Sequence, residues 1–221
     1  MLLQIAQVLS PQLLAQLKGL GAEDSLFADG RLTAGWHARE RKNNLQAKAN
    51  PKVAKLLSEA ETAILGHELV AYFARPKSIV RLMLSRYDQS MHYGPHVDDA
   101  LMSGQRTDLS FTVFISDDSE YEGGELVIDE PAAERPYKLG AGNMLLYPSS
   151  TLHRVEPVSS GQRLVLVGWI RSFIRSAEQR EILFDLERAI ANLRPQQETQ
   201  QASLELLLKT RSNLLRQWAE D

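Results

Sequence analysis

Apolar residues recur at helical spacing near both ends of the chain, while the central region alternates as strands do. Residues 2–9 predict a short strand. Ser10-Pro11 is a typical helix start, because serine caps free backbone N–H groups and proline suits the first turn. The helix that follows is expected to end at the glycine pair Gly19 and Gly21, and its apolar residues are Leu13, Leu14 and Leu17.

A second helix is predicted after a polar stretch, residues 22–50, that shows no clear period. It should run from Pro51 to about Phe73. Its apolar face would consist of Val53, Leu56, Leu57, Ala60, Ile64 and positions 68–71.

Short strand-like runs fill the centre of the chain. They cover residues 79–87, 108–116, 124–128, 143–147 and 162–171. Turn-forming clusters separate them, at Gly94-Pro95, Asp117-Asp118, Gly123-Gly124, Gly140 to Gly142, Pro148 to Ser150 and Ser159 to Gly161. Many short strands without long helices between them favour an antiparallel sandwich or barrel over a parallel sheet.

Helical spacing returns at the C-terminal end. Ser176 and Gln179 have the spacing of a capping box, and Pro195 should end the first helix. The two apolar stripes are Ile182, Leu183, Leu186, Ile190 and Leu193, and then Leu204, Leu207, Leu208, Leu215 and Trp218. The sequence therefore predicts a mainly β domain over residues 1–175, with its core at about 78–175, followed by a helical hairpin over 176–221.

Composition narrows the classes of function. With 221 residues and 43% hydrophobic content the chain can build one real core, and its net charge of −3 gives no sign of a nucleic-acid or membrane partner. The absence of cysteine excludes disulfides and thiolate metal sites. No apolar run approaches the roughly 20 residues of a membrane span, and the start lacks a basic signal region, so we expect a cytoplasmic protein.

The segment His96-Val97-Asp98 is the first candidate for chemistry. In an extended chain residues i and i+2 project from one face, so the imidazole and the carboxylate could hold one ion. Alone the pattern is weak, since such tripeptides also occur in polar surface loops. A second histidine would complete the two-histidine, one-carboxylate set that suits non-haem Fe(II).

Two residues downstream add to this pattern. His153 follows a strand-like run and a turn, and Arg163 begins an apolar strand ten positions later. Singly they would be a core histidine and an edge arginine. Together, on successive strands of a hairpin, they would place a cation in the cavity of the metal, where its planar guanidinium could bind the distal carboxylate of 2-oxoglutarate.

With these residues the chain resembles the prolyl-hydroxylase-like 2-oxoglutarate oxygenases, and within them the bacterial PKHD-type hydroxylases associated with iron uptake. The matching segments cover about residues 80–175. They are Arg86-Tyr87, His96 to Asp99, Arg106 to Ser110, Gly123 to Leu126, Tyr147 to Val155 and Pro157 to Arg163.

The resemblance implies a double-stranded β-helix, or jelly roll, and a hydroxylase that uses O₂ on a small-molecule or peptidyl substrate. It implies Fe(II) at His96, Asp98 and His153, the distal carboxylate of 2-oxoglutarate at Arg163, and L-ascorbate as reductant. Tyr87 matches a tyrosine that hydrogen-bonds the co-substrate, although a core aromatic fits its position equally well. Because Asp98 is intact, no ligand position is left vacant for a halide.

For other residues near these motifs we expect structural or solvent-exposed roles. Asp99 is expected to be solvated or to lie behind the ligands, and His92 and Tyr93 to lie on a mobile loop, with a substrate entrance as the alternative. Gly123-Gly124 should serve backbone geometry at a strand start. Trp36, His37 and the basic run Arg39 to Lys42 should form a solvated face.

Two alternatives from other classes stay open at this point. A cupin-like metal-binding or iron-sensing protein would use the same three ligands without oxygenase turnover, although it would not need Arg163. An interaction module would act through the C-terminal hairpin beside a vestigial barrel, against which the intact ligand set argues. The hairpin could also form a homodimer, because its leucine stripes exceed what one barrel face covers.

Overall fold

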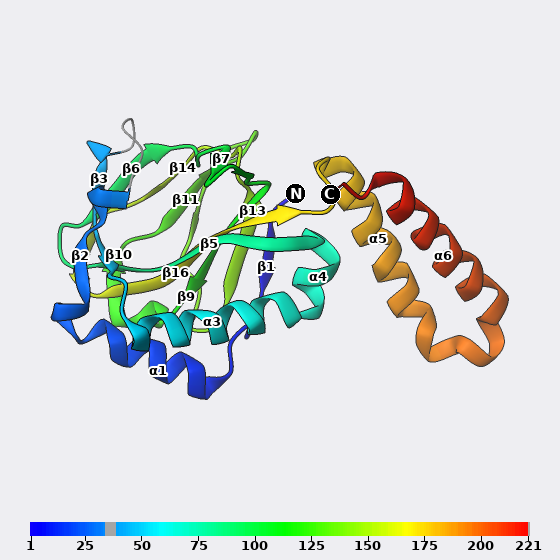
Figure 1. Ribbon diagram of the computed structural model, residues 1–221, viewed down its shortest axis with the longest axis horizontal. Coiled ribbons are helices and arrows are strands. Elements are labelled where there is room, and N and C mark those ends of the chain that lie inside the picture. Colours follow the sequence, from blue (N-terminus) through cyan, green and yellow to red (C-terminus); the bar gives the residue numbers. More distant parts are fainter. Residues whose placement is uncertain (34–38, 221) are drawn as a thin grey trace.

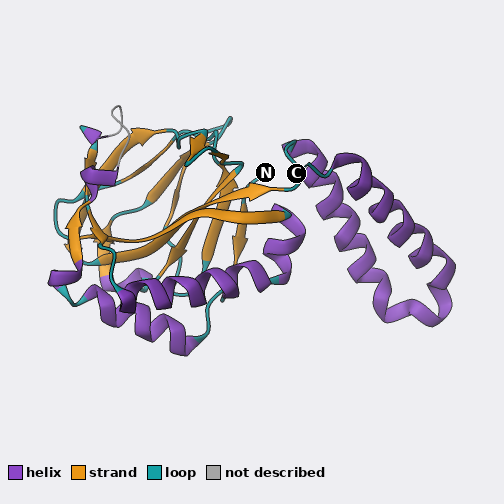
Figure 2. Cartoon of the chain, in the orientation of Figure 1, coloured by secondary structure: helices purple, strands orange, loops and turns teal. Residues whose placement is uncertain are grey.

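Two antiparallel sheets face each other and form the body of the protein (Figure 1, Figure 2). The computed structural model describes residues 1–33 and 39–220. The major sheet has the order β1 (Leu3–Ile5), β13 (Met144–Pro148), β9 (Leu109–Phe114), β16 (Arg163–Ser172), β5 (Pro76–Tyr87), β4 (Leu45–Ala47) and β2 (Phe27–Asp29). The minor sheet has the order β12 (Glu134–Tyr137), β11 (Leu126–Asp129), β14 (His153–Val155), β6 (His92–His96) and β3 (Lys42–Asn43).

Two short strand pairs complete the β structure of the described residues. One joins β10 (Tyr121–Gly123) to β15 (Val158–Gly161), and the other joins β7 (Leu101–Met102) to β8 (Gln105–Arg106). The fold is the jelly roll that the resemblance implies, and the antiparallel arrangement predicted from the strand pattern is confirmed.

Alternation along the long strands divides the core into two parts. Leu164 and Leu166 of β16 point to the outer face of the major sheet, and Arg163 and Val165 point between the sheets. Helices α1 (Pro11–Gly21), α3 (Pro51–Gly66) and α4 (Glu68–Ala74) cover the outer face, as Figure 1 shows. The space between the sheets therefore holds both apolar side chains and the polar ones that form the site.

The N-terminal elements follow the predicted pattern with one correction. Ser10 accepts a hydrogen bond from the backbone N–H of Leu13, as the capping motif requires. The helix expected over residues 51–73 is instead two helices, because His67 has an extended backbone (ψ 124°) directly after Gly66. Glycine is a poor helix former, and this allows the chain to turn there.

The C-terminal elements form the predicted helical hairpin, α5 (Ala177–Leu193) and α6 (Gln197–Trp218), which projects from the sheets in Figure 1. Ser176 caps α5 through the N–H of Gln179. Leu183 and Ile190 of the predicted apolar stripe are buried, whereas Ile182 is 51% exposed. Phe184 of α5 packs edge-on against Phe73 of α4, with ring centroids 5.3 Å apart.

A buried carboxylate fastens the hairpin to the sheets. The Glu187 side chain of α5 is 2% exposed and accepts a hydrogen bond of 2.8 Å from Arg75, which directly precedes β5. Arg211 of α6 lies 3.3 Å from the same carboxylate. The Glu187 carboxylate of α5 thus pairs with one cation next to the barrel, Arg75, and one on α6, Arg211.

We expect Glu187→Ala to lower the free energy of unfolding by about 3–5 kcal/mol, because it leaves the largely buried Arg75 without its counter-charge. Asp185→Ala is the matched control, since its carboxylate is 62% exposed and pairs with the exposed Arg188; it should cost less than about 1 kcal/mol. Urea unfolding of the three proteins measures both values. Equal losses in the two variants would show that Glu187 does not hold the hairpin.

Candidate metal centre

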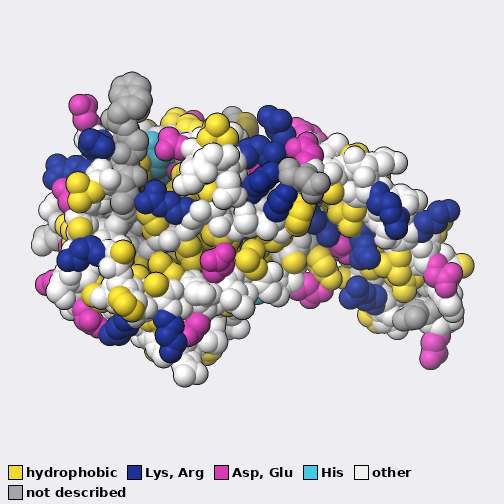
Figure 3. Space-filling model, in the orientation of Figure 1, with side chains coloured by type: hydrophobic (Ala, Val, Ile, Leu, Met, Phe, Trp, Pro, Cys, Tyr) yellow, Lys and Arg dark blue, Asp and Glu magenta, His cyan; other side chains and the backbone are white. Residues whose placement is uncertain are grey.

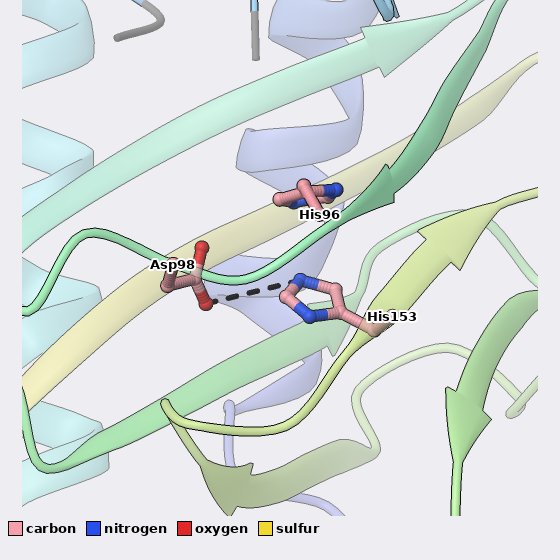
Figure 4. A group of neighbouring side chains, drawn as sticks. All are labelled: His96, Asp98 and His153. Atoms are coloured by element: carbon pink, nitrogen blue, oxygen red, sulfur yellow. Dashed lines mark ion pairs between the residues drawn. The ribbon is translucent and has the colours of Figure 1, made fainter. Parts of the chain in front are cut away.

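Pairing between two strands of the minor sheet brings the two histidines together. His96 is the last residue of β6 and His153 is the first of β14, and they are direct partners across the antiparallel pair. Their ring centroids are 4.2 Å apart. Asp98 lies two residues beyond β6, and its carboxylate turns toward the imidazoles (Figure 4).

One candidate ligand atom from each of the three side chains lies within 4.8 Å of the others, which is compact enough to hold one metal ion. The dashed line in Figure 4 marks the 3.8 Å between His153 Nε2 and Asp98 Oδ2. All three side chains are less than a tenth exposed. Two imidazoles and a carboxylate are the donor set that suits non-haem iron.

Backbone carbonyls fix the orientation of both rings. His96 Nδ1 lies 2.8 Å from the carbonyl oxygen of Gly94, and His153 Nδ1 lies 3.0 Å from that of Thr151. A carbonyl oxygen can only accept, so each Nδ1 carries the proton and donates it. With Nδ1 as the donor, each ring presents Nε2 as the candidate metal ligand, an arrangement that raises the basicity of the ligand.

Two serines support the carboxylate. Ser110 Oγ lies 2.6 Å from Asp98 Oδ2 and 2.8 Å from Ser149 Oγ. Because a hydroxyl has one hydrogen, Ser110 donates to Asp98 and accepts from Ser149. Neither serine was predicted as part of the site. The inward alternation of residues 108–116 is the signal that could have identified Ser110.

Tyr93 covers one face of the His96 ring, with the two rings stacked at 3.6 Å and 15°. Burial is the main cause that lowers the pKa of His96 to about 4; the nearby His153 adds to this effect and Asp98 opposes it.

The expectation of a mobile loop was wrong for both His92 and Tyr93, because both lie on β6. Tyr93 lines the cavity, whereas His92 is not among its lining residues.

Arg163 brings a second charge into the same cavity from the opposite sheet. It is the first residue of β16 and is 1% exposed. Its guanidinium lies 5.0 Å from the ring centre of Tyr87 and 5.6 Å from that of Phe114. The Nε and Nη1 atoms are buried without a hydrogen-bond partner among the described residues. A buried cation with unused donors is costly, so the site fits an anion that would complete it.

The path from His153 to Arg163 differs from the expected hairpin. Strand β15 lies between them, and Ser159 to Gly161, expected as a turn, belongs to it. His153 is on the minor sheet and Arg163 on the major one, so they face the cavity from opposite sides. Gly124 has φ +67°, and a Cβ there would come 3.0 Å from Arg163 Cδ, so the predicted backbone role of this glycine includes room for the cation.

Tyr87 ends β5 directly opposite Arg163 in the strand register and is 3% exposed. Burial raises the pKa of its hydroxyl, and the adjacent Arg163 charge opposes that shift. The residue is thus both an interior aromatic and a neighbour of the candidate co-substrate cation.

The cavity between the sheets has a volume of about 110 Å³ and is lined by the three candidate ligands together with Tyr87, Tyr93, Ser110 and Arg163. It also reaches Lys42, Arg81 and Trp169, which were not predicted to take part.

Lys42 is 6% exposed, so its expected place on a solvated face was wrong, although Arg39 is exposed as expected. Asp99 is exposed and outside the metal cluster, also as expected. Trp36 and His37 lie outside the described residues.

Comparisons with known proteins agree with this geometry. Residues 82–171 match the model of the 2OG-Fe(II) oxygenase superfamily, and residues 178–220 match the PKHD-type hydroxylase C-terminal domain. A PKHD-type hydroxylase of Maricaulis maris is 46% identical over 221 residues, covering all of both chains. One of Gloeothece citriformis is 45% identical over 222 residues, again covering all of both chains.

Solved structures share the fold at low identity. A Pseudomonas putida prolyl-4-hydroxylase has a TM-score of 0.54 at 19% identity, covering 77% of this chain and 92% of its own. The viral collagen prolyl hydroxylase of Paramecium Bursaria Chlorella virus-1, in a 2OG complex, has a TM-score of 0.53 at 18% identity, covering 77% of this chain and 96% of its own.

No helix among the described residues is long and apolar enough to cross a membrane.

The lowered pKa of His96 predicts that the free energy of unfolding of the metal-free protein depends on pH. The unfolded chain protonates this histidine as pH falls through about 6.5, whereas the folded chain does so only near 4. Between these values the unfolded state binds more protons, so stability falls as pH falls. We expect the wild type to lose free energy of unfolding relative to His96→Gln from pH 7 to 4.5, measured by denaturant titration without metal. A difference that is constant with pH would contradict the neutral buried imidazole.

Proposed function

The chain belongs to the PKHD-type hydroxylases of the 2OG-Fe(II) oxygenase superfamily, and from this membership we propose which of its residues carry the activity. The enzyme is an Fe(II)- and 2-oxoglutarate-dependent dioxygenase, which converts 2-oxoglutarate to succinate and CO₂ while it hydroxylates a C–H bond. We assign Fe(II) to His96, Asp98 and His153. The convergence of these three buried side chains is the observation that carries the assignment.

Arg163 is proposed to bind the distal carboxylate of 2-oxoglutarate. The buried Nε and Nη1 atoms without partners support this role, because a guanidinium can give a carboxylate two parallel charge-assisted hydrogen bonds. We propose Tyr87 as a second contact to the co-substrate, supported by its position against the guanidinium.

The bound Fe(II) supplies the oxygen chemistry, and the chain supplies geometry and exclusion of water. Gly94 and Thr151 hold the two imidazoles by their carbonyl groups, and Ser110 orients the Asp98 carboxylate. Tyr93 shields one face of His96 from solvent. The cavity is lined by residues of both sheets, so charged groups would act there at low dielectric.

L-Ascorbate is proposed as reductant and the cytoplasm as location, both on the grounds given by the sequence. The division into a catalytic domain over residues 1–175 and a hairpin over 176–221 is likewise proposed. The proposed substrate classes are a peptidyl residue, a free amino acid, a siderophore and a small metabolite. The comparisons give no support to a cupin-like sensor without turnover.

The decisive experiment removes the carboxylate ligand. Purified protein with Fe(II), ascorbate and 2-oxoglutarate should form succinate slowly even without a substrate. Asp98→Ala should lower iron affinity more than 100-fold and abolish succinate formation, because two neutral imidazoles are left to hold the ion. Asp99→Ala, one residue along and exposed, should keep both properties within about twofold. Full iron affinity in Asp98→Ala would disprove the ligand assignment.

We further propose a homodimer through the C-terminal helices. Leu206 of α6 and Ile182 of α5 are 61% and 51% exposed, and Figure 3 shows hydrophobic side chains at the surface of the hairpin among charged ones. Leu206→Glu should therefore shift the mass measured by gel filtration with light scattering from dimer to monomer. Gln201→Glu, at an exposed position of the same helix, is the control for one added negative charge. A monomeric wild type would rule this dimer out.

A further inference from the structure

The cavity holds a second pair of cations that neither the metal nor the co-substrate assignment uses. Lys42 comes from β3 of the minor sheet and Arg81 from β5 of the major sheet, and both line the cavity. We propose that Lys42 and Arg81 form a subsite for a carboxylate of the primary substrate, which is therefore a small acid held by this group beside the metal. This inference rests on the proposed function of the same cavity.

The two cations repel each other across the cavity. Burial is the main cause that lowers the pKa of Lys42 to about 8, and the charge of Arg81 is the next cause. Asp98 and Asp29 oppose this shift. Arg81 is exposed where it lines the cavity, and none of the ion pairs found among the described residues includes its guanidinium. An anion between the two side chains would relieve the repulsion and give Arg81 a planar partner.

A third hydrogen-bond donor, the indole of Trp169, lies beside Arg81 on the neighbouring strand. Trp169 is the direct partner of Arg81 across β16 and β5, and its buried Nε1 has no hydrogen-bond partner among the described residues. An indole N–H can only donate. Arg81 and Trp169 thus present donors alone to the cavity, which fits an oxygen-rich group and not an amine.

The strand register places this subsite next to the metal. Trp169 is also paired with Ser110, which supports Asp98. Strands are about 4.8 Å apart, so the backbone of Arg81 lies about 10 Å from that of Ser110. A small acid that contacts Arg81 can therefore place a C–H bond over the metal. Lys42 also lies over the ring of Tyr93, which stacks on His96.

The co-substrate site lies at the other end of the cavity. Arg163 pairs with Tyr87, which is six positions along β5 from Arg81. At about 3.3 Å per residue these positions are about 20 Å apart, farther than a five-carbon dicarboxylate can reach. The two cationic ends therefore bind two different molecules.

The test uses paramagnetic relaxation, which needs no turnover. Protein carrying Mn(II) and 2-oxoglutarate is titrated with butyrate, L-alanine and L-proline, and with the primary amide of each. The acids should show Mn(II)-enhanced relaxation of their C–H protons, at concentrations at least tenfold lower than the amides. Equal relaxation by acids and amides would overturn the proposal, as would a failure of every acid to bind. If inorganic phosphate displaced the acids at concentrations far below those at which the acids bind, the result would contradict a carboxylate site.

Variants separate the two ends of the cavity. Arg81→Gln and Lys42→Met should each weaken the acids at least tenfold while the amides change little, because only the acid uses the charge. Arg163→Gln should instead weaken 2-oxoglutarate binding, measured by calorimetry. Arg188→Gln on α5 is the matched control for loss of an exposed arginine. Retention of the acid preference in Arg81→Gln would disprove the subsite. Absence of succinate formation by the wild type would refute the proposed function and leave this readout intact.

Discussion

The antiparallel pairing of β6 with β14 sets His96 opposite His153, and most of the site depends on this one register. A shift of one residue would turn either histidine to the other face of the sheet. The carbonyl groups that hold the rings come from residues two positions before each histidine, so they also depend on the local backbone of these strands. The major sheet adds support from the opposite side through Ser110 and the candidate co-substrate cation.

Burial of charge is the cost of this arrangement. The interior between the sheets contains Arg163, Lys42 and the Asp98 carboxylate, although an apolar filling would be easier to fold. Aromatic rings moderate the cost, because Tyr87 and Phe114 face the guanidinium and Tyr93 faces Lys42. The outer face of the major sheet, packed by three helices, is by contrast a plain hydrophobic core, and we infer that it supplies much of the stability.

The long strands could be predicted from sequence because their inner and outer residues alternate over many positions. Strands 79–87, 108–116, 143–147 and 162–171 were predicted within about three residues of their observed ends. Short strands such as β6 and β15 were missed, since Gly94-Pro95 and Ser159 to Gly161 have turn composition and become strands only through their partners. The three candidate ligands were identified from spacing and resemblance, and the structure brings them together. Lys42 was misread because a basic run gives no sign of which member is buried.

Gly124 connects backbone conformation to the size of the site. Its positive φ and missing side chain leave the space into which the Arg163 aliphatic stem fits. A side chain at this position would press on the Arg163 stem, so the place of the guanidinium in the cavity depends on the absence of a side chain at residue 124. Under the proposed assignment of the co-substrate's distal carboxylate to Arg163, the length of dicarboxylate that the cavity accepts therefore depends on a glycine that has no functional group of its own.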